Sequence, residues 1–217
     1  MPVDMRMLKS EFVSHVGCRL VLMKAEVIQP DESVKLAAQA TIERQNKMAI
    51  LKIVKYPEAV LEQAGDAVTE FNDELKQLVS DMFETMYDAP GVGLAAPQVG
   101  VSKQVFVMDC SGGKDPQQKI AMINPQVLTV EGEYTAEEGC LSFPGIYFDV
   151  KRPLRAVVRA QDVDGVHFEV DGLELTARCM LHEKDHLDGV LFLQRTTTLK
   201  REMAKRRIRK LIKQGEW

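Results

Sequence analysis

Apolar residues recur at steps of three and four along residues 71–87, and this period predicts an amphipathic helix. Thr69 or Asn72 can cap its start, and Ala89-Pro90-Gly91 ends it. One side of the helix is expected to pack in the core. The apolar positions are Phe71, Leu75, Leu78, Val79, Met82, Phe83, Met86 and Tyr87.

Shorter apolar segments follow and predict strands over residues 104–109 and 120–128. Residues 154–170 predict a hairpin that turns at Asp164-Gly165. Asp171-Gly172 is expected to introduce a second helix over residues 173–188, with Gly189 as its C-terminal cap. Because the strands surround a central helix and do not alternate regularly with helices, the predicted fold class is α+β, with antiparallel or mixed β-sheets.

Three regions are expected along the chain. Residues 1–47 are mixed and polar, and they predict an N-terminal extension of unknown role. Met48 opens a more apolar segment, so the catalytic domain is expected over residues 48–196. Residues 197–217 predict a basic C-terminal helix packed on that domain.

Composition favours a cytoplasmic protein, and a monomer is expected. The 217 residues are 45% apolar, enough for a sizeable core, and contain no run of about 20 apolar residues. Residues 1–47 hold seven basic and six acidic residues, whereas transit peptides avoid acids, and no secretory signal is evident. The four cysteines have no regular spacing and are interpreted as free thiols in a reducing compartment. They are Cys18, Cys110, Cys140 and Cys179.

The second predicted helix contains His182 and His186, four residues apart, with Glu183 after the first. Side chains at i and i+4 project from one face of a helix, so the two imidazoles can share one metal ion. Glu183 points about 100° away, where it can reach a metal-bound water without binding the metal. A metal that acidifies water and a carboxylate that moves its proton suit hydrolysis. The alternative is a chance HExxH pattern, but histidines and acids on a buried helix each need a partner.

A catalytic metal site needs a third protein ligand and an open position. In the common zinc metalloproteases this ligand lies downstream, where the chain offers Glu202 in a basic segment and no histidine. Upstream, Cys140 follows Gly139 in the segment EEGCLSFPG, residues 137–145. A thiolate is a strong ligand for iron or zinc, although a lone cysteine is more often a buried core thiol.

Residues 91–100, GVGLAAPQVG, are expected to form a loop whose glycines let a substrate backbone approach closely. Gln98 offers an amide donor that can stabilise an oxyanion. The segment lacks the spacing and the lysine of a phosphate-binding loop.

Together, three segments resemble the ordered signature motifs of the peptide deformylases. They are Gly91-Val92-Gly93-Leu94-Ala95-Ala96-Pro97-Gln98, Glu138-Gly139-Cys140-Leu141-Ser142 and His182-Glu183-Lys184-Asp185-His186. The resemblance covers roughly residues 48–212. It implies a metallohydrolase that removes the N-formyl group from the initiator methionine of nascent bacterial polypeptides.

The resemblance also implies roles for individual residues. By motif position, Cys140, His182 and His186 would hold the metal, with water in the fourth position. Glu183 would be the general acid/base. Gln98 and the backbone N–H of Leu141 would bind the oxygen of the tetrahedral intermediate. Fe(II) is the expected metal, and Zn, Ni or Co can substitute, since a thiolate and two imidazoles suit any of them.

The substrate is expected to lie alongside Gly93 and Gly139 as an added strand, in the space that the glycines leave. Its methionine side chain needs an apolar slot, for which Val92, Leu175 and Cys179 are the expected walls. Core packing explains Leu175 and Cys179 equally well.

Asp185 matches the acid of the third motif. It is expected to support the site rather than to bind the metal. Arg152 is the basic residue expected to neutralise it.

The C-terminal segment is strongly basic. Residues 198–217 contain eight basic and two acidic residues, whereas the preceding 197 residues hold 20 basic and 30 acidic ones. A surface helix packed on the domain is one interpretation of this segment. The other, which the resemblance implies, is docking to ribosomal RNA near the exit of the nascent chain.

Three rival hypotheses remain at this stage. An HExxH endopeptidase would have a third ligand downstream and would tolerate Cys140→Ser. A non-catalytic binding module would use the metal for structure alone and would not need Glu183 or Gln98. A deformylase of a mitochondrion or plastid would use residues 1–47 for targeting.

Overall fold

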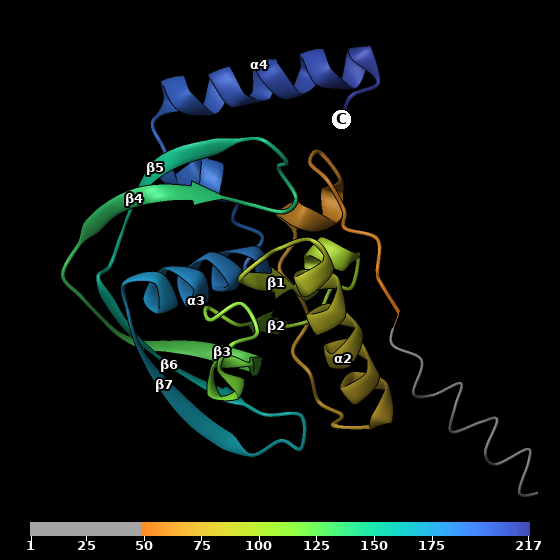
Figure 1. Cartoon of the computed structure of the whole chain (residues 1–217), viewed down its shortest axis with the longest axis vertical. Coiled ribbons are helices and arrows are strands. Elements are labelled where there is room, and N and C mark those ends of the chain that lie inside the picture. The colour runs from red at the N-terminus through yellow and green to blue at the C-terminus, as the bar shows by residue number, and fades with distance from the viewer. Residues whose placement is uncertain (1–48) are drawn as a thin grey trace, which may run out of the picture. The chain divides into compact units, whose positions relative to one another are not determined.

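The computed structural model describes residues 49–217, which form two antiparallel sheets and three α-helices (Figure 1). The predicted extension over residues 1–47, with Cys18, lies outside the described residues and stays a prediction. The larger sheet has the strand order β1-β2-β3-β6-β7, and the smaller is the β4-β5 hairpin. Their bounds are β1 (Gly93–Ala95), β2 (Val105–Met108), β3 (Ile120–Glu131), β4 (Tyr134–Gly139), β5 (Tyr147–Arg152), β6 (Arg155–Gln161) and β7 (His167–Leu173). The predicted α+β class is confirmed.

Helix α2 (Asp73–Asp88) confirms the first periodic segment. Asn72 is the cap, because its side chain accepts a 3.0 Å hydrogen bond from the Leu75 backbone N–H. The helix packs on β1 and β2 and builds a core cluster with them. Its buried apolar side chains are Leu75, Val79, Met82, Phe83 and Met86.

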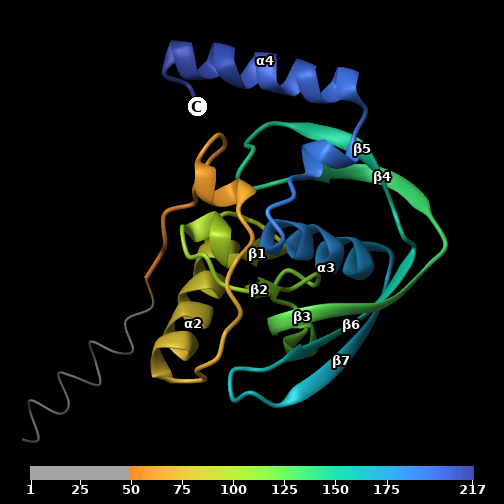
Figure 2. The same ribbon diagram turned by 180° about the vertical axis from the view of Figure 1, so that it is seen from behind.

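Helix α3 (Glu174–Leu187) lies between the five-stranded sheet and the β4-β5 hairpin (Figures 1 and 2). One side packs in a core cluster with β2 and β6, and its histidines face the hairpin. The predicted cap is confirmed, since Gly189 has the left-handed backbone angle φ +70° just beyond the helix. A helix buried on both sides positions its polar side chains rigidly.

The helix predicted over residues 173–188 is confirmed within one residue at each end, but Asp171-Gly172 before it is not a turn. Both residues belong to β7, where Asp171 pairs with Val157 and Gly172 with Ala156. The hairpin turn at residues 162–165 is confirmed, because Gly165 N–H donates to the Asp162 carbonyl at 3.0 Å and has φ +83°. The strand therefore continues until the helix begins.

Two other segments differ from the sequence-based expectation. Residues 91–100, expected as a loop, contain β1 and a 3₁₀ turn over Ala96–Val99. The β4-β5 hairpin was not predicted at all. These two segments approach the polar face of α3 and supply the residues around its histidines.

Helix α4 (Thr198–Gln214) covers the outer side of the β4-β5 hairpin (Figure 1). Ala204 and Ile208 are buried in a core cluster with β5, whereas Leu199 and Met203 are 72% and 58% exposed. Beyond the helix, the Trp217 indole N–H donates to the Tyr56 carbonyl oxygen. Within residues 49–217, no helix is both long and apolar enough to cross a membrane.

Candidate metal centre

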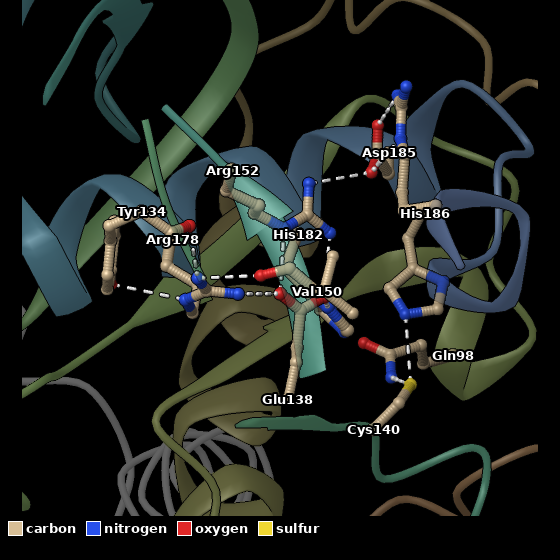
Figure 3. Close-up of polar contacts among 11 residues, drawn as sticks. Gln98, Tyr134, Glu138, Cys140, Val150, Arg152, Arg178, His182, Asp185 and His186 are labelled. Atoms are coloured by element: carbon tan, nitrogen blue, oxygen red, sulfur yellow. Dashed lines mark hydrogen bonds and ion pairs between the residues drawn. The ribbon is translucent and has the colours of Figure 1, made fainter. Parts of the chain in front are cut away.

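Cys140, His182 and His186 converge between α3 and the β4-β5 hairpin (Figure 3). Cys140 follows β4, in the loop that leads to β5, and the two histidines face it from α3. His186 Nε2 lies 3.1 Å from Cys140 Sγ, and one ligand atom from each of the three residues lies within 4.8 Å of the others. The structure thus brings together the three side chains predicted as ligands.

Glu138 fixes the orientation of His182. Its carboxylate lies 2.7 Å from His182 Nδ1 and accepts further hydrogen bonds from Arg152 at 2.7 Å and Arg178 at 2.8 Å. Burial alone would raise the pKa of Glu138, but Arg152 and His182 hold it well below its usual range. A carboxylate only accepts hydrogen bonds, so His182 Nδ1 is the donor. The other nitrogen, Nε2, is left to face the centre.

The three side chains fit a divalent transition metal. Burial lowers the pKa of His186 well below its ordinary value and so favours the neutral imidazole, the form that binds metals. Burial alone would lower the pKa of His182 too, but its hydrogen bonds to Cys140 and Glu138 raise it well above the ordinary value. A metal ion at this centre would displace the proton from the His182 nitrogen that it binds, because metal binding needs the neutral imidazole. One thiolate and two imidazoles are a donor set suited to iron, zinc, nickel or cobalt.

Glu183 is buried beside the two histidines. Its side chain is 4% exposed, and Oε2 has no hydrogen-bond partner within residues 49–217. Burial raises the pKa of Glu183 to about 7. A carboxyl group with a pKa near neutrality can both accept and return a proton at physiological pH.

Gly93 is required for this position of Glu183. A Cβ atom at residue 93 would lie 2.5 Å from Glu183 Oε1 and 2.8 Å from Cys179 Sγ. A larger residue would therefore displace the carboxylate or the thiol, so the second glycine of the first motif makes room for the protein's own side chains.

A cavity of about 510 Å³ opens beside the centre. All of the predicted site residues line it except His186, which lies deeper and is 1% exposed. The lining includes Val92, Gly93, Gln98, Gly139, Cys140, Leu141, Leu175, Cys179, His182 and Glu183. Leu175 is 47% exposed, so core packing does not explain it, whereas Cys179 is buried in the core as well as lining the cavity.

Two hydrogen-bond donors flank Cys140. The Gln98 side chain is held by the Ala95 N–H, which donates to Oε1 at 2.8 Å, and its Nε2 lies 3.4 Å from Cys140 Sγ. The Leu141 backbone N–H makes no hydrogen bond within residues 49–217. Gln98 Nε2 also donates to Ser142 Oγ at 3.4 Å, and both of its contacts are long. Gln98 and Leu141 line the cavity, where a substrate oxygen can accept from their N–H groups.

The comparisons with known proteins agree with this geometry. Residues 50–202 match the family model described as polypeptide deformylase. A peptide deformylase of Acidobacterium capsulatum is 54% identical over 170 residues, which cover 78% of this chain and all of the relative. The chain belongs to the peptide deformylase family. It is a metal-dependent hydrolase that removes the formyl group from nascent peptides.

Solved structures of the family support the fold. A peptide deformylase crystal structure from Legionella pneumophila is 44% identical, with a TM-score of 0.72, and the match covers 77% of this chain and 98% of the other. Peptide deformylase 1B of Arabidopsis thaliana is 37% identical, with a TM-score of 0.71, over 76% and 92% of the two chains. The resemblance seen in the three motifs is confirmed as family membership.

The charged residues around this deformylase site were only partly predicted from the sequence. Arg152 was expected to neutralise Asp185, and its Nη1 does donate to Asp185 Oδ2 at 2.9 Å. Arg195 contacts the same carboxylate and was not predicted. No role was expected for Glu138 or Arg178 either. Glu138 stands two residues before the ligand Cys140, which is a usable signal, whereas Arg178 has none that distinguishes it from a surface arginine.

The endopeptidase hypothesis does not fit this centre. Its downstream third ligand is not found within residues 49–217, where Cys140 completes the cluster with the two histidines. Glu202 lies on α4, with Lys205 as its charged neighbour at 4.0 Å. The binding-module hypothesis is wrong, because the family is enzymatic.

Proposed function

We propose that Glu183 moves the proton in the deformylation reaction, while Gln98 and Leu141 stabilise the oxyanion. The observation that supports this most directly is Glu183 Oε2, which is buried beside the cluster of Cys140, His182 and His186 and has no hydrogen-bond partner among residues 49–217. Glu183 accepts a proton from the attacking water and returns it to the nitrogen that leaves with the peptide. The N–H groups of Gln98 and Leu141 donate to the oxygen that gains negative charge when the formyl carbonyl is attacked.

Cys140, His182 and His186 are the proposed metal ligands, and Fe(II) the proposed native metal, with Zn, Ni or Co as substitutes. A divalent ion held there supplies Lewis acidity and makes water acidic enough to react near neutral pH. The thiolate and the two imidazoles support a transition metal rather than magnesium or calcium, which prefer oxygen ligands.

The proposed substrate is the formyl-methionyl end of a nascent polypeptide. The methionine side chain lies against Val92, Leu175 and Cys179, and the peptide backbone passes Gly93 and Gly139. The cavity of about 510 Å³ supports this assignment, since it lies in the size range of small-ligand sites and reaches the metal cluster.

The ribosome is a second proposed partner, through α4. The helix has exposed basic residues, and it also exposes Leu199 and Met203, which a purely solvated helix would not favour. Deleting residues 198–217 would remove the buried Ile208 and the Trp217 contact to Tyr56, and would thus disturb the domain. Substitutions that remove the positive charges of exposed residues and leave the helix in place are therefore the better test.

That test replaces four exposed basic residues of α4, Arg206, Arg209, Lys210 and Lys213, by Gln. Ribosome cosedimentation is expected to weaken and to lose much of its salt dependence, because the electrostatic contribution scales with the number of neutralised phosphates. Replacing the exposed Lys52, Lys114 and Lys151 by Gln is the control and is expected to leave cosedimentation unchanged. Equal binding by both variants would contradict the ribosome proposal.

The remaining assignments are proposals as well. We propose a bacterial cytoplasmic monomer with a catalytic domain over residues 48–196 and a basic helical region over residues 197–217. The core cluster that joins Ile208 to Val150 and Phe192 supports a helix that packs on the domain.

The direct test of substrate and reaction is formate release from a formyl-methionyl tripeptide. Protein loaded anaerobically with Fe(II) is expected to release formate and to leave the matching acetyl-methionyl tripeptide intact, because the smaller formyl carbonyl fits beside Gln98 and Leu141. Cys140→Ser is expected to lose both metal and activity. Cleavage of internal peptide bonds, or full activity in Cys140→Ser, would favour the endopeptidase hypothesis instead.

A further inference from the structure

Two cysteines outside the metal cluster, Cys110 and Cys179, pack in the same core cluster beside the cavity. Cys179 Sγ, on α3, donates to the Val92 carbonyl oxygen at 3.4 Å, and the same oxygen accepts the Asp109 N–H at 2.9 Å. Asp109 is followed directly by Cys110, which packs against the core cluster that contains Cys179. The segment that follows β2 and the middle of α3 thus meet at one carbonyl group and place both cysteines in the same core cluster.

The pair is asymmetric in exposure and in acidity. Cys110 is partly exposed, whereas Cys179 is 4% exposed. A hydrogen bond from Cys179 lowers the pKa of the Cys110 thiol, and the same contact raises the pKa of Cys179. Cys110 is therefore the more accessible and more acidic thiol, and Cys179 is its buried and less acidic neighbour, which is the arrangement of an attacking and a resolving thiol.

The loop around Cys110 is held in place. Asp109 Oδ1 accepts from the backbone N–H of Ser111 at 2.8 Å, and Oδ2 accepts from the Tyr87 hydroxyl at 2.7 Å. Asp109 is itself fully buried. These contacts fix the backbone that carries Cys110 beside the core cluster of Cys179, and nothing in the deformylation mechanism uses Cys110.

We propose that Cys110 and Cys179 are a thiol-modification site, at which a small disulfide such as oxidised glutathione forms a reversible Cys110–Cys179 disulfide that inhibits the enzyme. In the first step the Cys110 thiolate attacks one glutathione sulfur, the glutathione S–S bond breaks and one glutathione thiolate leaves. In the second step Cys179 gives up its proton and attacks the Cys110 sulfur, and the second glutathione leaves as a thiolate. Both leaving thiolates are protonated, so one glutathione disulfide is reduced for each protein disulfide formed.

The consequence for catalysis follows from Gly93. Cys179 Sγ and Glu183 Oε1 lie side by side against this glycine, 2.8 and 2.5 Å from where its Cβ would be. A covalent bond to Cys110 removes the Cys179 thiol from the Val92 carbonyl and changes the contact that positions Glu183. The inhibitory effect rests on the proposed role of Glu183, whereas the formation of the disulfide does not.

The experiment treats Ni(II)-loaded Cys18→Ser protein, in which Cys140 is bound to metal, with oxidised glutathione. Digestion with trypsin without reductant is expected to yield a linked pair of peptides, residues 104–114 and 179–184, two hydrogens lighter than their sum. Formate release is expected to fall at least fivefold with the metal retained, and dithiothreitol is expected to restore it. Cys110→Ser in the same background is expected to keep its basal activity and to resist the oxidant.

Each other outcome is decisive. Absence of the linked peptides, or a linked protein with unchanged formate release, would overturn the proposal. Equal inhibition of Cys110→Ser would also overturn it, since the sensitive group would then be a different one. If the protein releases no formate even before treatment with oxidised glutathione, the proposed function is contradicted. The peptide map would still decide whether the disulfide forms.

Discussion

The Glu138 carboxylate lies 2.7 Å from His182 Nδ1 and is itself held by two buried arginines (Figure 3). This contact joins the β4-β5 hairpin to α3, the two elements that together provide the three metal ligands. Hydrogen bonds of this kind set the tautomer and orientation of a ligating histidine. The hairpin therefore does more than supply Cys140, because it also fixes the imidazole opposite.

Glu138→Gln is expected to weaken metal binding about 10- to 100-fold, as loss of such a supporting carboxylate generally does. It also leaves Arg152 and Arg178 without their shared anion, which is expected to destabilise the protein by about 3–5 kcal/mol. Competition with a chelator and thermal unfolding measure the two effects. Glu137→Gln, one residue away and exposed, is the matched control. Unchanged metal affinity in Glu138→Gln would show that the contact is dispensable.

Asp185→Asn tests the other carboxylate that Arg152 contacts. Arg152 and Arg195 both donate to this carboxylate, which is 7% exposed. The substitution is expected to cost about 1–3 kcal/mol, the range for a buried hydrogen bond that loses a charged partner. Asp188→Asn, whose exposed side chain pairs with Lys184, is expected to change stability by less than about 0.5 kcal/mol. If the Asp185→Asn protein had the stability and metal content of the original protein, the supporting role of Asp185 would be contradicted.

Stability of the metal-free protein should report the raised pKa of Glu183. Burial raises this pKa from 4.5 to about 7, so the folded state binds a proton that the unfolded state releases at lower pH. The ionised carboxylate consequently destabilises the fold, and stability is lost as pH rises from about 4.5 to about 7. Because glutamine does not ionise, Glu183→Gln is expected to be about 3 kcal/mol more stable than the original protein at pH 8 and nearly equal to it at pH 4. Urea unfolding at the two pH values measures this, and a difference that does not depend on pH would refute it.

Gly93→Ala tests the close packing behind Glu183. The added methyl group meets Glu183 Oε1 and Cys179 Sγ at distances that neither can accept without moving. Formate release is expected to fall by about 100-fold, the scale associated with a displacement of about 1 Å at a catalytic group. Gly112→Ala, on the 109–115 loop, is the comparison: its methyl group meets no atom within 4 Å, and although its φ of +64° makes alanine cost some stability, the variant is expected to keep its activity. Full activity of Gly93→Ala would mean that the carboxylate position is not decisive.

The sequence predicts the parts of this fold whose burial follows a simple period. Helix α2 buries one apolar face, and the 162–165 turn has the aspartate and glycine that such a turn needs, so both were recognised. The β4-β5 hairpin was missed for a physical reason. Its strands read YTAEEG and YFDVKR, with many charges, and charged residues normally indicate a solvent-exposed segment. Here Glu138 and Arg152 face inward and neutralise each other, which only the three-dimensional pairing reveals.

The same reasoning explains the predicted and the missed site residues. The two histidines and Glu183 have the HExxH spacing, which is typical of metal-dependent hydrolases. Cys140 and Gln98 lie in motifs that resemble those of the peptide deformylases. Arg178 and Arg195 have no such pattern, because any arginine that reaches a buried carboxylate would serve. Asp171 and Gly172 were expected to introduce the helix that begins after them, because both residue types favour turns, but strand pairing with β6 outweighs that preference.

The central claim is that Glu183 performs proton transfer at a centre formed by Cys140, His182 and His186. The most direct test compares original and Glu183→Gln protein, both loaded anaerobically with Fe(II), by formate release from a formyl-methionyl tripeptide and by metal content. Equal metal content with at least a 100-fold loss of formate release is predicted, because general acid–base catalysis contributes about 10²–10⁴-fold. Comparable activity in the two proteins at equal metal content would contradict the account and place the proton transfer on another group.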